Sequence, residues 1–377
     1  MIYFDNAASG GRKPDGVLSA VASSLKVCAN PGRSGHKLAL TCANLVQDCR
    51  NALNEFFYGY GFDRAVFTKN CTEALNIALF GVLKQGDHVV VSCMEHNSVL
   101  RPLERLKQAG VITYDVCPLS EASAEGNLSP EKIRSLIQPN TKLVAVTAAS
   151  NVNGATPPLS AIRAAIPDRV LLLCDGAQGG GHFPLSMQAL GIDLLTLAGH
   201  KGLMAIQGSG ALLFSPRVDP APLLYGGTGS MSLSLDMPDF YPDLLEAGTV
   251  AFPAIVSLLE GVRYLAPRLE RLQTQTLALT DYCLSGLKAL PQYRVYSQPN
   301  PSGIVAFAHP DLESEYLAGV LSAKYDIAVR GGLHCAPLMH EALGTLDGGL
   351  VRASFSHFNS PREIDELLFA LGEIANA

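Results

Sequence analysis

The sequence has no dense run of basic residues and no long apolar segment. Its 34 acidic and 28 basic side chains give a net charge of −6, without the cluster of lysine and arginine that neutralises a nucleic-acid backbone. No stretch approaches the roughly 18 apolar residues of a membrane span. Asp5 lies where a secretory signal would need an apolar segment. We therefore expect a cytoplasmic protein with no nucleic-acid or membrane partner.

Motifs of several common enzyme classes are also absent. No GxGxxG follows an apolar strand-like run, and no lysine is followed by serine or threonine, as a phosphate-binding P-loop requires. GxSxG and HExxH do not occur. These absences exclude the usual dinucleotide, nucleotide, serine-hydrolase and zinc-protease interpretations.

The nine cysteines form no CxxC pair, and their odd number in a long chain does not indicate a disulfide framework. We expect reduced thiols. Cys174 lies inside an apolar run, and Cys42 and Cys49 recur at helical spacing among apolar residues. Because free cysteine behaves as a small apolar side chain, these three are predicted core residues.

The chain is large enough to bury a substantial core. With 377 residues, of which 48% are hydrophobic and 16% charged, it is expected to divide into about two domains. Short apolar runs alternate with helical patterns, with strands expected near residues 65–67, 88–92, 143–147, 170–174, 194–198 and 211–214. Helices are expected over 72–83 and from Ser129 onwards. This alternation favours an α/β fold whose mainly parallel sheet is flanked by helices. From about Pro253 a long helical stretch leads into a smaller α+β region.

Polar residues follow several of these strands. Asn151, Asp175 and Lys201 each come directly after an apolar run, and ligands of parallel sheets bind beyond the carboxyl ends of the strands. GHK occurs at 35–37 and at 199–201, but only the second copy ends a strand and precedes glycines. Lys201 is therefore the better Schiff-base candidate.

An acid, a lysine and the distant Cys335 are the parts needed to bind pyridoxal phosphate beside a reactive sulfur. Taken singly, the lysine also fits a solvated loop and the aspartate a helix cap.

Ten segments, spread in order over residues 2 to 370, resemble the cysteine desulfurase family, the class V branch of fold-type I pyridoxal phosphate enzymes. The segments are MIYFDNAASGGRKP, NPGRSGHKLA, NCTEALNIAL, CMEHNSVLRP, SNVNGATPPL, CDGAQGGGHFPL, LAGHKG, EAGTVAFPAI, VRGGLHCAP and LVRASFSHFNSPREID. The resemblance implies a cofactor-binding large domain over 12–262. It also implies a small domain, formed by 1–11 and 263–377, that carries a catalytic cysteine loop.

The resemblance also implies how the cofactor ring is held. Lys201 would bind pyridoxal phosphate covalently and later move the α-proton of the substrate. Asp175 would keep the pyridine nitrogen protonated, so that the ring accepts electrons. Gln178 would donate to the phenolic oxygen of the cofactor, and Asn151 would be a second ring-side contact. His96 would stack on the ring face and relay a proton, although a lone histidine after a strand is more often structural.

The cofactor phosphate is expected at the start of a helix near Cys71 and Thr72, where free amides and the helix dipole favour an anion. By resemblance, His200 adds a contact, and Thr249 is contributed across the interface of a homodimer. Ala198 and Cys71 replace hydroxyl residues that many relatives carry. Each lost hydroxyl is expected to weaken phosphate binding by about 1 kcal/mol if nothing replaces it.

On the substrate side, the resemblance assigns Arg352 as the main carboxylate clamp and Arg330 as a second one. A surface ion pair is the alternative for either arginine alone. Cys335 would attack the substrate sulfur and carry it as a persulfide. The short spacing from Arg330 to Cys335 resembles group II enzymes and favours a dedicated sulfur-acceptor protein. Other residues expected near the substrate entrance are Ala8, Arg33, His36 and Asn151.

Three hypotheses about function follow. The first is a cysteine desulfurase that converts L-cysteine to L-alanine and mobilises the sulfur. The second is selenocysteine lyase, or another class V lyase on the same scaffold, because selenium leaves more readily and need not await the same thiol. The third is a non-catalytic scaffold protein derived from the family. The sequence does not identify the acceptor, the pathway, or the preference between sulfur and selenium.

Overall fold

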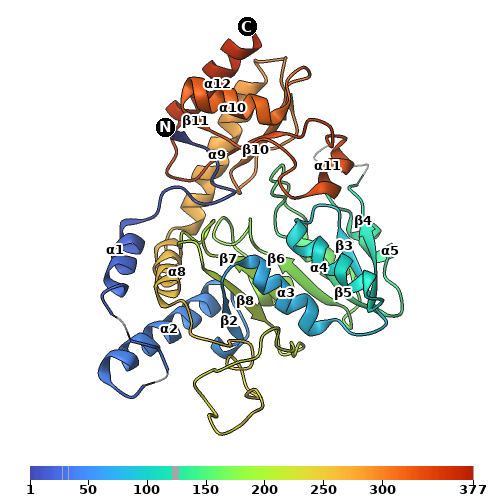
Figure 1. Cartoon of the computed structure of the whole chain (residues 1–377). Helices are drawn as coiled ribbons and strands as arrows, with labels where there is room; N and C mark the ends of the chain where they lie inside the picture. The colour runs from blue at the N-terminus through green and yellow to red at the C-terminus, as the bar shows by residue number, and fades with distance from the viewer. Residues whose placement is uncertain (28, 33, 121–126, 377) are drawn as a thin grey trace.

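The computed structural model describes residues 1–27, 29–32, 34–120 and 127–376. A seven-stranded sheet of order β2-β8-β7-β6-β5-β3-β4 forms the centre of the larger part (Figure 1). Its strands are β2 (Ala65–Thr68), β3 (Asp87–Ser92), β4 (Ile112–Cys117), β5 (Thr141–Thr147), β6 (Leu171–Asp175), β7 (Leu194–Ala198) and β8 (Gly210–Phe214). The pairs from β4 through β7 are parallel, whereas β8 runs antiparallel to both of its neighbours. The predicted α/β fold with a mainly parallel sheet is confirmed.

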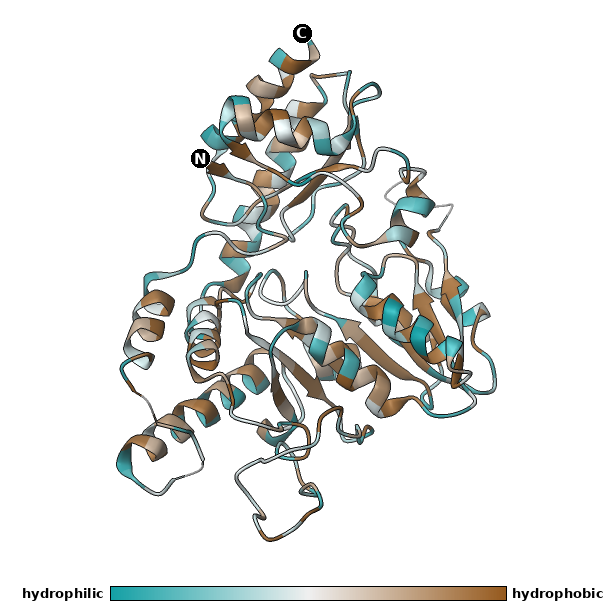
Figure 2. Cartoon of the chain, in the orientation of Figure 1, coloured by the Kyte–Doolittle hydropathy of each residue, from teal (hydrophilic) through white to brown (hydrophobic). Residues whose placement is uncertain are grey.

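Helices cover both faces of this sheet. Along β3 the side chains alternate, so that Val89 and Val91 pack with α3 and α4, whereas Val90 packs with α2 and α8 on the opposite face. Figure 2 shows the central strands as largely hydrophobic. The helices are α1 (Asp15–Ser24), α2 (Lys37–Phe56), α3 (Cys71–Val82), α4 (Asn97–Gln108), α5 (Pro130–Ser135), α6 (Leu159–Ala165), α7 (Met187–Leu190) and α8 (Phe252–Leu265).

Each strand predicted from the sequence is present, with bounds that differ by at most two residues. The predicted start of α5 is also confirmed, because the Ser129 side chain accepts a hydrogen bond from the Lys132 amide and Pro130 opens the helix. Strand β4 was not predicted. It lies at the sheet edge and buries only its two terminal residues, so its sequence lacks a continuous apolar run.

A second core joins the two ends of the chain. Strand β1 (Ile2–Tyr3) pairs in parallel with β11 (Ile327–Ala328), and the rings of Phe4 and Phe355 lie 4.9 Å apart. Both termini lie at this end of the molecule (Figure 1). The remaining elements are α9 (Leu269–Leu287), β9 (Arg294–Val295), β10 (Ile304–Ala308), α10 (Ser314–Tyr325), α11 (Pro337–Leu343), β12 (Val351–Ser354) and α12 (Pro361–Ala375). The domain limits at residues 11 and 262 stay a prediction.

Two further expectations concern cysteines and membranes. Of the eight cysteines that the structure describes, none is in a disulfide; seven, including Cys42, Cys49 and Cys174, are buried, and Cys335 is exposed. The prediction that Cys42, Cys49 and Cys174 are core residues is confirmed. Within the described part of the chain, no helix combines the length and the apolar character needed to span a bilayer.

Candidate active site

A cavity of about 240 Å³ lies at the carboxyl ends of β5, β6 and β7. It is larger than the roughly 150 Å³ cavity that admits benzene in an engineered protein core. Its walls come from segments that lie far apart in the sequence, between Ala7 and Arg352. Among the residues that line it are the predicted site residues Ala8, Cys71, Thr72, His96, Asn151, Asp175, Gln178, His200, Lys201, Arg330 and Arg352.

Lys201 extends from a tight turn after β7. The turn requires glycine next to it, because a Cβ at Gly202 would collide with the carbonyl of Gly180 and the ring of His182. Burial lowers the pKa of the Lys201 amine, and the carboxylate of Asp175 opposes that effect. Lower proton affinity leaves more of the amine neutral, which is the form that attacks a carbonyl carbon.

Asp175 ends β6 and is 2% exposed. Its Oδ1 accepts the Ala177 amide at 2.9 Å and faces the Cys71 Sγ at 3.3 Å. Burial raises the pKa of the Cys71 thiol well above its usual value, so this thiol stays protonated and donates. Among the described residues nothing hydrogen-bonds Oδ2, which is left for a ligand in the cavity.

The start of α3 presents main-chain donors to the same cavity. Asn70 caps the helix through its side chain, which accepts the Glu73 amide at 2.9 Å. The amides of Cys71 and Thr72 precede the first residue that can find an intrahelical acceptor. These amides and the dipole of a twelve-residue helix favour an anion here.

His96 is the N-cap of α4 and lines the cavity. Its Nδ1 accepts the Ser98 amide at 3.0 Å, which assigns the ring proton to Nε2. Burial, followed by the charge of Lys201, lowers the pKa of His96 to about 4. The ring is therefore neutral near pH 7.

Two amide side chains connect the cavity to other segments. Gln178 donates through Nε2 to the Ala7 carbonyl at 2.9 Å, and its buried Oε1 has no partner among the described residues. Asn151 donates through Nδ2 to the His334 carbonyl at 2.7 Å. Unpartnered buried polar atoms are uncommon, so Gln178 Oε1 indicates a place for a ligand donor.

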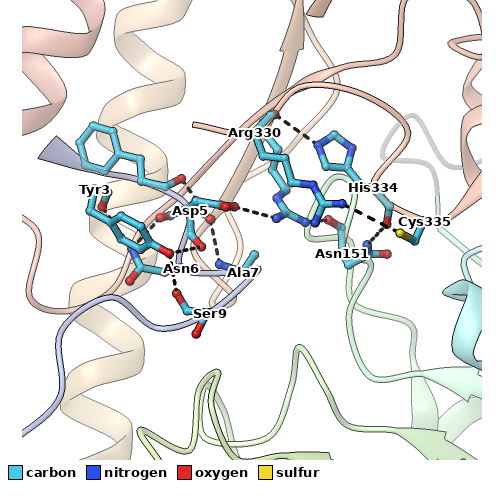
Figure 3. A network of polar contacts seen from close by, with 12 residues as sticks. Tyr3, Asp5, Asn6, Ala7, Ser9, Asn151, Arg330, His334 and Cys335 are labelled. Atoms are coloured by element: carbon cyan, nitrogen blue, oxygen red, sulfur yellow. Dashed lines mark hydrogen bonds and ion pairs between the residues drawn. The ribbon is translucent and has the colours of Figure 1, made fainter. Parts of the chain in front are cut away.

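Arg352 lies on β12 and is 1% exposed. Its Nη1 donates to the Asn151 carbonyl at 2.8 Å and its Nη2 to Asp5 Oδ1 at 3.0 Å. Its buried Nε has no partner among the described residues. Figure 3 shows Asp5 and Asn151 in this network. The guanidinium is thus fixed and keeps donors for a further anion.

Cys335 lies on the loop between β11 and α11, beside the cavity. Its Sγ is 3.9 Å from Nη2 of Arg330, which does line the cavity (Figure 3). The main-chain carbonyl of Cys335 accepts the Asn97 amide at 2.7 Å. The thiol is therefore exposed and has a guanidinium beside it.

Two predicted residues that the structure describes, Thr249 and His36, are not brought to this cavity. Thr249 is exposed on the segment between β8 and α8, where it lines a separate cavity of about 130 Å³. His36 is exposed and caps α2, with Nδ1 accepting the Ala39 amide at 3.2 Å. Arg33 lies outside the described residues.

The sequence interpretation missed Asp5, which contacts Arg352, and Glu95, which lies beneath the cavity floor. Glu95 is fully buried, its Oε1 accepts the Ser92 hydroxyl at 2.5 Å and the Thr147 amide at 2.7 Å, and its Oε2 has no described partner. Burial raises the pKa of Glu95 to about 8. The signal for both was an acidic residue in an otherwise apolar segment.

Comparison with known proteins agrees with this geometry. The sequence model of the aminotransferase class-V family matches residues 2–367. A probable cysteine desulfurase of Methanothermobacter thermautotrophicus is 33% identical over 99% of this chain and 94% of its own length. A cysteine desulfurase of Dickeya dadantii is 30% identical over 99% of this chain and 92% of its own length.

Solved structures give the same result. An apo cysteine desulfurase of Thermococcus onnurineus NA1 superposes with a TM-score of 0.91 at 31% identity, covering 100% of this chain and 94% of its own. The cysteine desulfurase CsdA (S-sulfonic acid) of Escherichia coli has a TM-score of 0.87 at 26% identity, covering 98% of this chain and 94% of its own. The chain therefore belongs to the aminotransferase class-V family, as its resemblance predicted.

Proposed function

We propose that this chain is a pyridoxal phosphate-dependent cysteine desulfurase. It takes sulfur from L-cysteine, leaves L-alanine and carries the sulfur as a persulfide on Cys335. One observation carries the proposal: the exposed Cys335 thiol lies 3.9 Å from Arg330, at the edge of the cavity that also holds Lys201 and Asp175. The names of the relatives support the same reaction.

The residues around the cavity fit pyridoxal phosphate. When bound, this cofactor supplies a carbonyl carbon that reacts with amines and a ring that accepts electron density from the substrate α-carbon. The described partners of the Asp175 side chain contact its Oδ1, and its Oδ2 suits a protonated ring nitrogen. The unpartnered Oε1 of Gln178 can accept from a donor on the ligand. The first amides of α3 suit the phosphate, with His200 nearby.

Lys201 and His96 handle protons. The lowered pKa of Lys201 makes its amine available first for covalent attachment and, once released, as the base that takes the α-proton of the substrate. His96 is neutral with its proton on Nε2, so it can donate a hydrogen bond into the cavity without bringing a charge there. Asn151 joins the ring-side wall to the cysteine loop through its bond to His334.

Arg352 and Arg330 orient the substrate. The free Nε and the remaining N–H groups of Arg352 bind the carboxylate of L-cysteine, while Asp5 and Asn151 hold the guanidinium in place. Arg330 pairs with Arg352 through the main chain, and its Nη2 lies 3.9 Å from the Cys335 Sγ. Binding the substrate by its carboxylate fixes where its sulfur lies.

Cys335 performs the sulfur transfer. Its thiolate attacks the substrate sulfur, a sulfur–sulfur bond forms, and the carbon–sulfur bond breaks with its electron pair left on carbon. Protonation of that carbon gives L-alanine. The persulfide then faces solvent, because Cys335 is the exposed cysteine among those described, and an acceptor protein removes its outer sulfur.

A homodimer is part of the proposal. The segment between β8 and α8 exposes a set of large apolar side chains that suits burial against a second copy. The set is Leu223, Leu224, Tyr225, Met231, Leu233, Leu235 and Phe240. Thr249 lies on the same exposed segment, which supports its proposed role at the cofactor phosphate of the partner subunit. A cytoplasmic location stays a prediction of the sequence.

The test compares the wild-type protein with Cys335→Ser, both loaded with pyridoxal phosphate. Sulfide and alanine are measured from L-cysteine, with a thiol reductant as the final acceptor. The proposal requires bound cofactor in both proteins and sulfide from the wild type alone. Undiminished sulfide release from Cys335→Ser removes Cys335 from the mechanism. Selenide released from selenocysteine by Cys335→Ser, with cysteine untouched, favours a selenocysteine lyase.

A further inference from the structure

Three side chains form a hydrogen-bonded chain behind the Cys335 loop. Thr345 Oγ1 lies 2.9 Å from His340 Nδ1, and His340 Nε2 lies 3.4 Å from His334 Nδ1. His334 Nε2 lies 3.3 Å from the carbonyl oxygen of Arg330, a contact that Figure 3 shows. The two imidazole rings stack with centroids 5.6 Å apart. All three side chains are buried, and none belongs to the cavity wall except His334.

These hydrogen bonds all run in one direction. A carbonyl oxygen only accepts, so His334 carries its proton on Nε2 and donates it to Arg330. Nδ1 of His334 is then an acceptor, and it receives the Nε2 proton of His340. Nδ1 of His340 lies 2.9 Å from the hydroxyl of Thr345 and 3.3 Å from its carbonyl oxygen. Because Nε2 of this neutral ring holds the proton that His334 receives, Nδ1 is an acceptor and the hydroxyl is its donor. The order of donation is Thr345, His340, His334 and the Arg330 carbonyl, with both rings neutral.

The loop that this chain supports has an unfavourable backbone. His334 and Cys335 have successive φ values of +50° and +57°, a region that residues other than glycine rarely adopt. Four contacts hold it there. Asn151 binds the carbonyl of His334, Asn97 binds the carbonyl of Cys335, the His334 ring is tied to Arg330, and the Ala336 amide donates to the Leu333 carbonyl at 3.0 Å. Only the third depends on His340 and Thr345.

We propose that His340 and Thr345 are positioning residues for Cys335. They fix the tautomer and orientation of the His334 ring, and the ring holds the Cys335 thiol beside Arg330. The sulfur-carrying side chain is therefore presented from a fixed loop, and the acceptor must come to it. This inference rests on the proposed function only for the transfer step; the placement of the thiol beside Arg330 is independent of it.

The test uses two pairs of variants in the cofactor-loaded protein. Thr345→Val keeps the shape of the side chain and removes the hydroxyl, whereas Thr345→Ser keeps the hydroxyl. His340→Phe keeps a stacking ring without its nitrogen atoms, whereas His340→Gln keeps polar atoms. Glu341→Gln, an exposed position on the same helix, is the matched control. Cofactor absorbance reports whether each variant folds and binds pyridoxal phosphate.

Two readouts separate positioning from packing. The first is kcat and KM for L-cysteine. We expect Thr345→Val and His340→Phe to lower kcat about tenfold, the factor that corresponds to one hydrogen bond, while KM stays within about twofold. The second is the rate at which iodoacetamide alkylates the Cys335 peptide. We expect it to fall by about threefold, because a thiol that leaves this place is no longer held beside the positive charge of Arg330.

We expect wild-type kinetic constants and a wild-type alkylation rate for the two conservative variants and the control, which are Thr345→Ser, His340→Gln and Glu341→Gln. The inference is overturned if Thr345→Val and His340→Phe keep wild-type kcat and alkylation rates. It is also overturned if the conservative variants lose as much as the disruptive ones, since packing would then explain the loss. If the wild-type protein itself makes no persulfide, the proposed function fails, and the alkylation rates still test the positioning.

Discussion

The thiol of Cys71 lies 3.3 Å from the carboxylate of Asp175. Cys71 was expected beside the cofactor phosphate, where many relatives carry a hydroxyl residue, but its side chain contacts the acid proposed for the ring nitrogen. A second contact, from its Sγ to Thr196 Oγ1 at 3.4 Å, holds it there. Cys71 occupies the first position of α3 with its side chain buried. The helix therefore offers its main-chain amides to the cavity while its first side chain supports Asp175.

Cys71→Ala is predicted to weaken pyridoxal phosphate binding modestly. The change removes one donor to Asp175, and a weak neutral hydrogen bond contributes about 0.5–1 kcal/mol, or roughly a threefold change in affinity. Cys71→Ser is expected to bind at least as tightly as the wild type. Titration of the cofactor-free protein, followed by absorbance, measures both. Equal affinity in all three proteins would mean that the thiol contributes nothing to Asp175.

Arg352→Lys is predicted to raise KM for L-cysteine at least tenfold while the cofactor stays bound. An ammonium group cannot reproduce the fork that contacts Asp5 and Asn151 and still bind a carboxylate by two parallel bonds. Steady-state kinetics measure KM. Arg169→Lys serves as the control, because Arg169 lies before the amino end of β6, away from the cavity at the carboxyl end. An unchanged KM would assign the substrate carboxylate to another residue.

The free energy of unfolding is predicted to decrease as the pH falls from about 6.5 towards 4. Burial lowers the pKa of His96 and of His200 to about 4 and that of His334 to about 2. Their pKa values in the folded chain lie below those in the unfolded chain, so the unfolded state binds more protons in this range. The stability present above pH 6.5 is thus lost on acidification.

Urea denaturation at several pH values measures this loss. His334→Asn removes one of these groups, so the slope of its unfolding free energy between pH 6 and 4.5 should be smaller by at most about 1.4 kcal/mol per pH unit. Equal slopes in the variant and the wild type would show that His334 titrates normally in the folded chain.

Leu233→Glu combined with Leu235→Glu is predicted to convert the proposed homodimer to monomers. Both side chains are fully exposed in the single chain, and a charge at each position disfavours burial against a second copy. Sedimentation velocity measures the mass. Phe369→Glu, at another exposed apolar position, is the control and should leave the dimer intact. A double variant that remains dimeric would move the interface away from this segment.

Much of the fold was predictable because buried parallel strands are continuous apolar runs. Such runs at 143–147, 170–174 and 194–198 placed Asn151, Asp175 and Lys201 at one edge of the sheet. Strand β4 was not predictable in this way, because an edge strand with exposed side chains carries no such run. Arg352 and Cys335 were found through resemblance, since nothing local distinguishes them.

The contacts between distant residues were beyond the sequence. Asp5 and Arg352 meet only because β1 joins the C-terminal core, and Cys71 faces Asp175 only because α3 packs against β7. His334, His340 and Thr345 lie close in the sequence, yet their alignment depends on the φ values of the cysteine loop and the end of α11. Periodicity predicts elements, whereas these contacts depend on how the elements pack.

The central claim is that Cys335 carries sulfur taken from L-cysteine. The most direct measurement is mass analysis of the cofactor-loaded enzyme after exposure to L-cysteine, followed by digestion under conditions that preserve persulfides. The account predicts one added sulfur atom on the peptide that contains Cys335, removed by a thiol reductant. An unmodified Cys335 peptide, in a sample that has formed alanine, would contradict it.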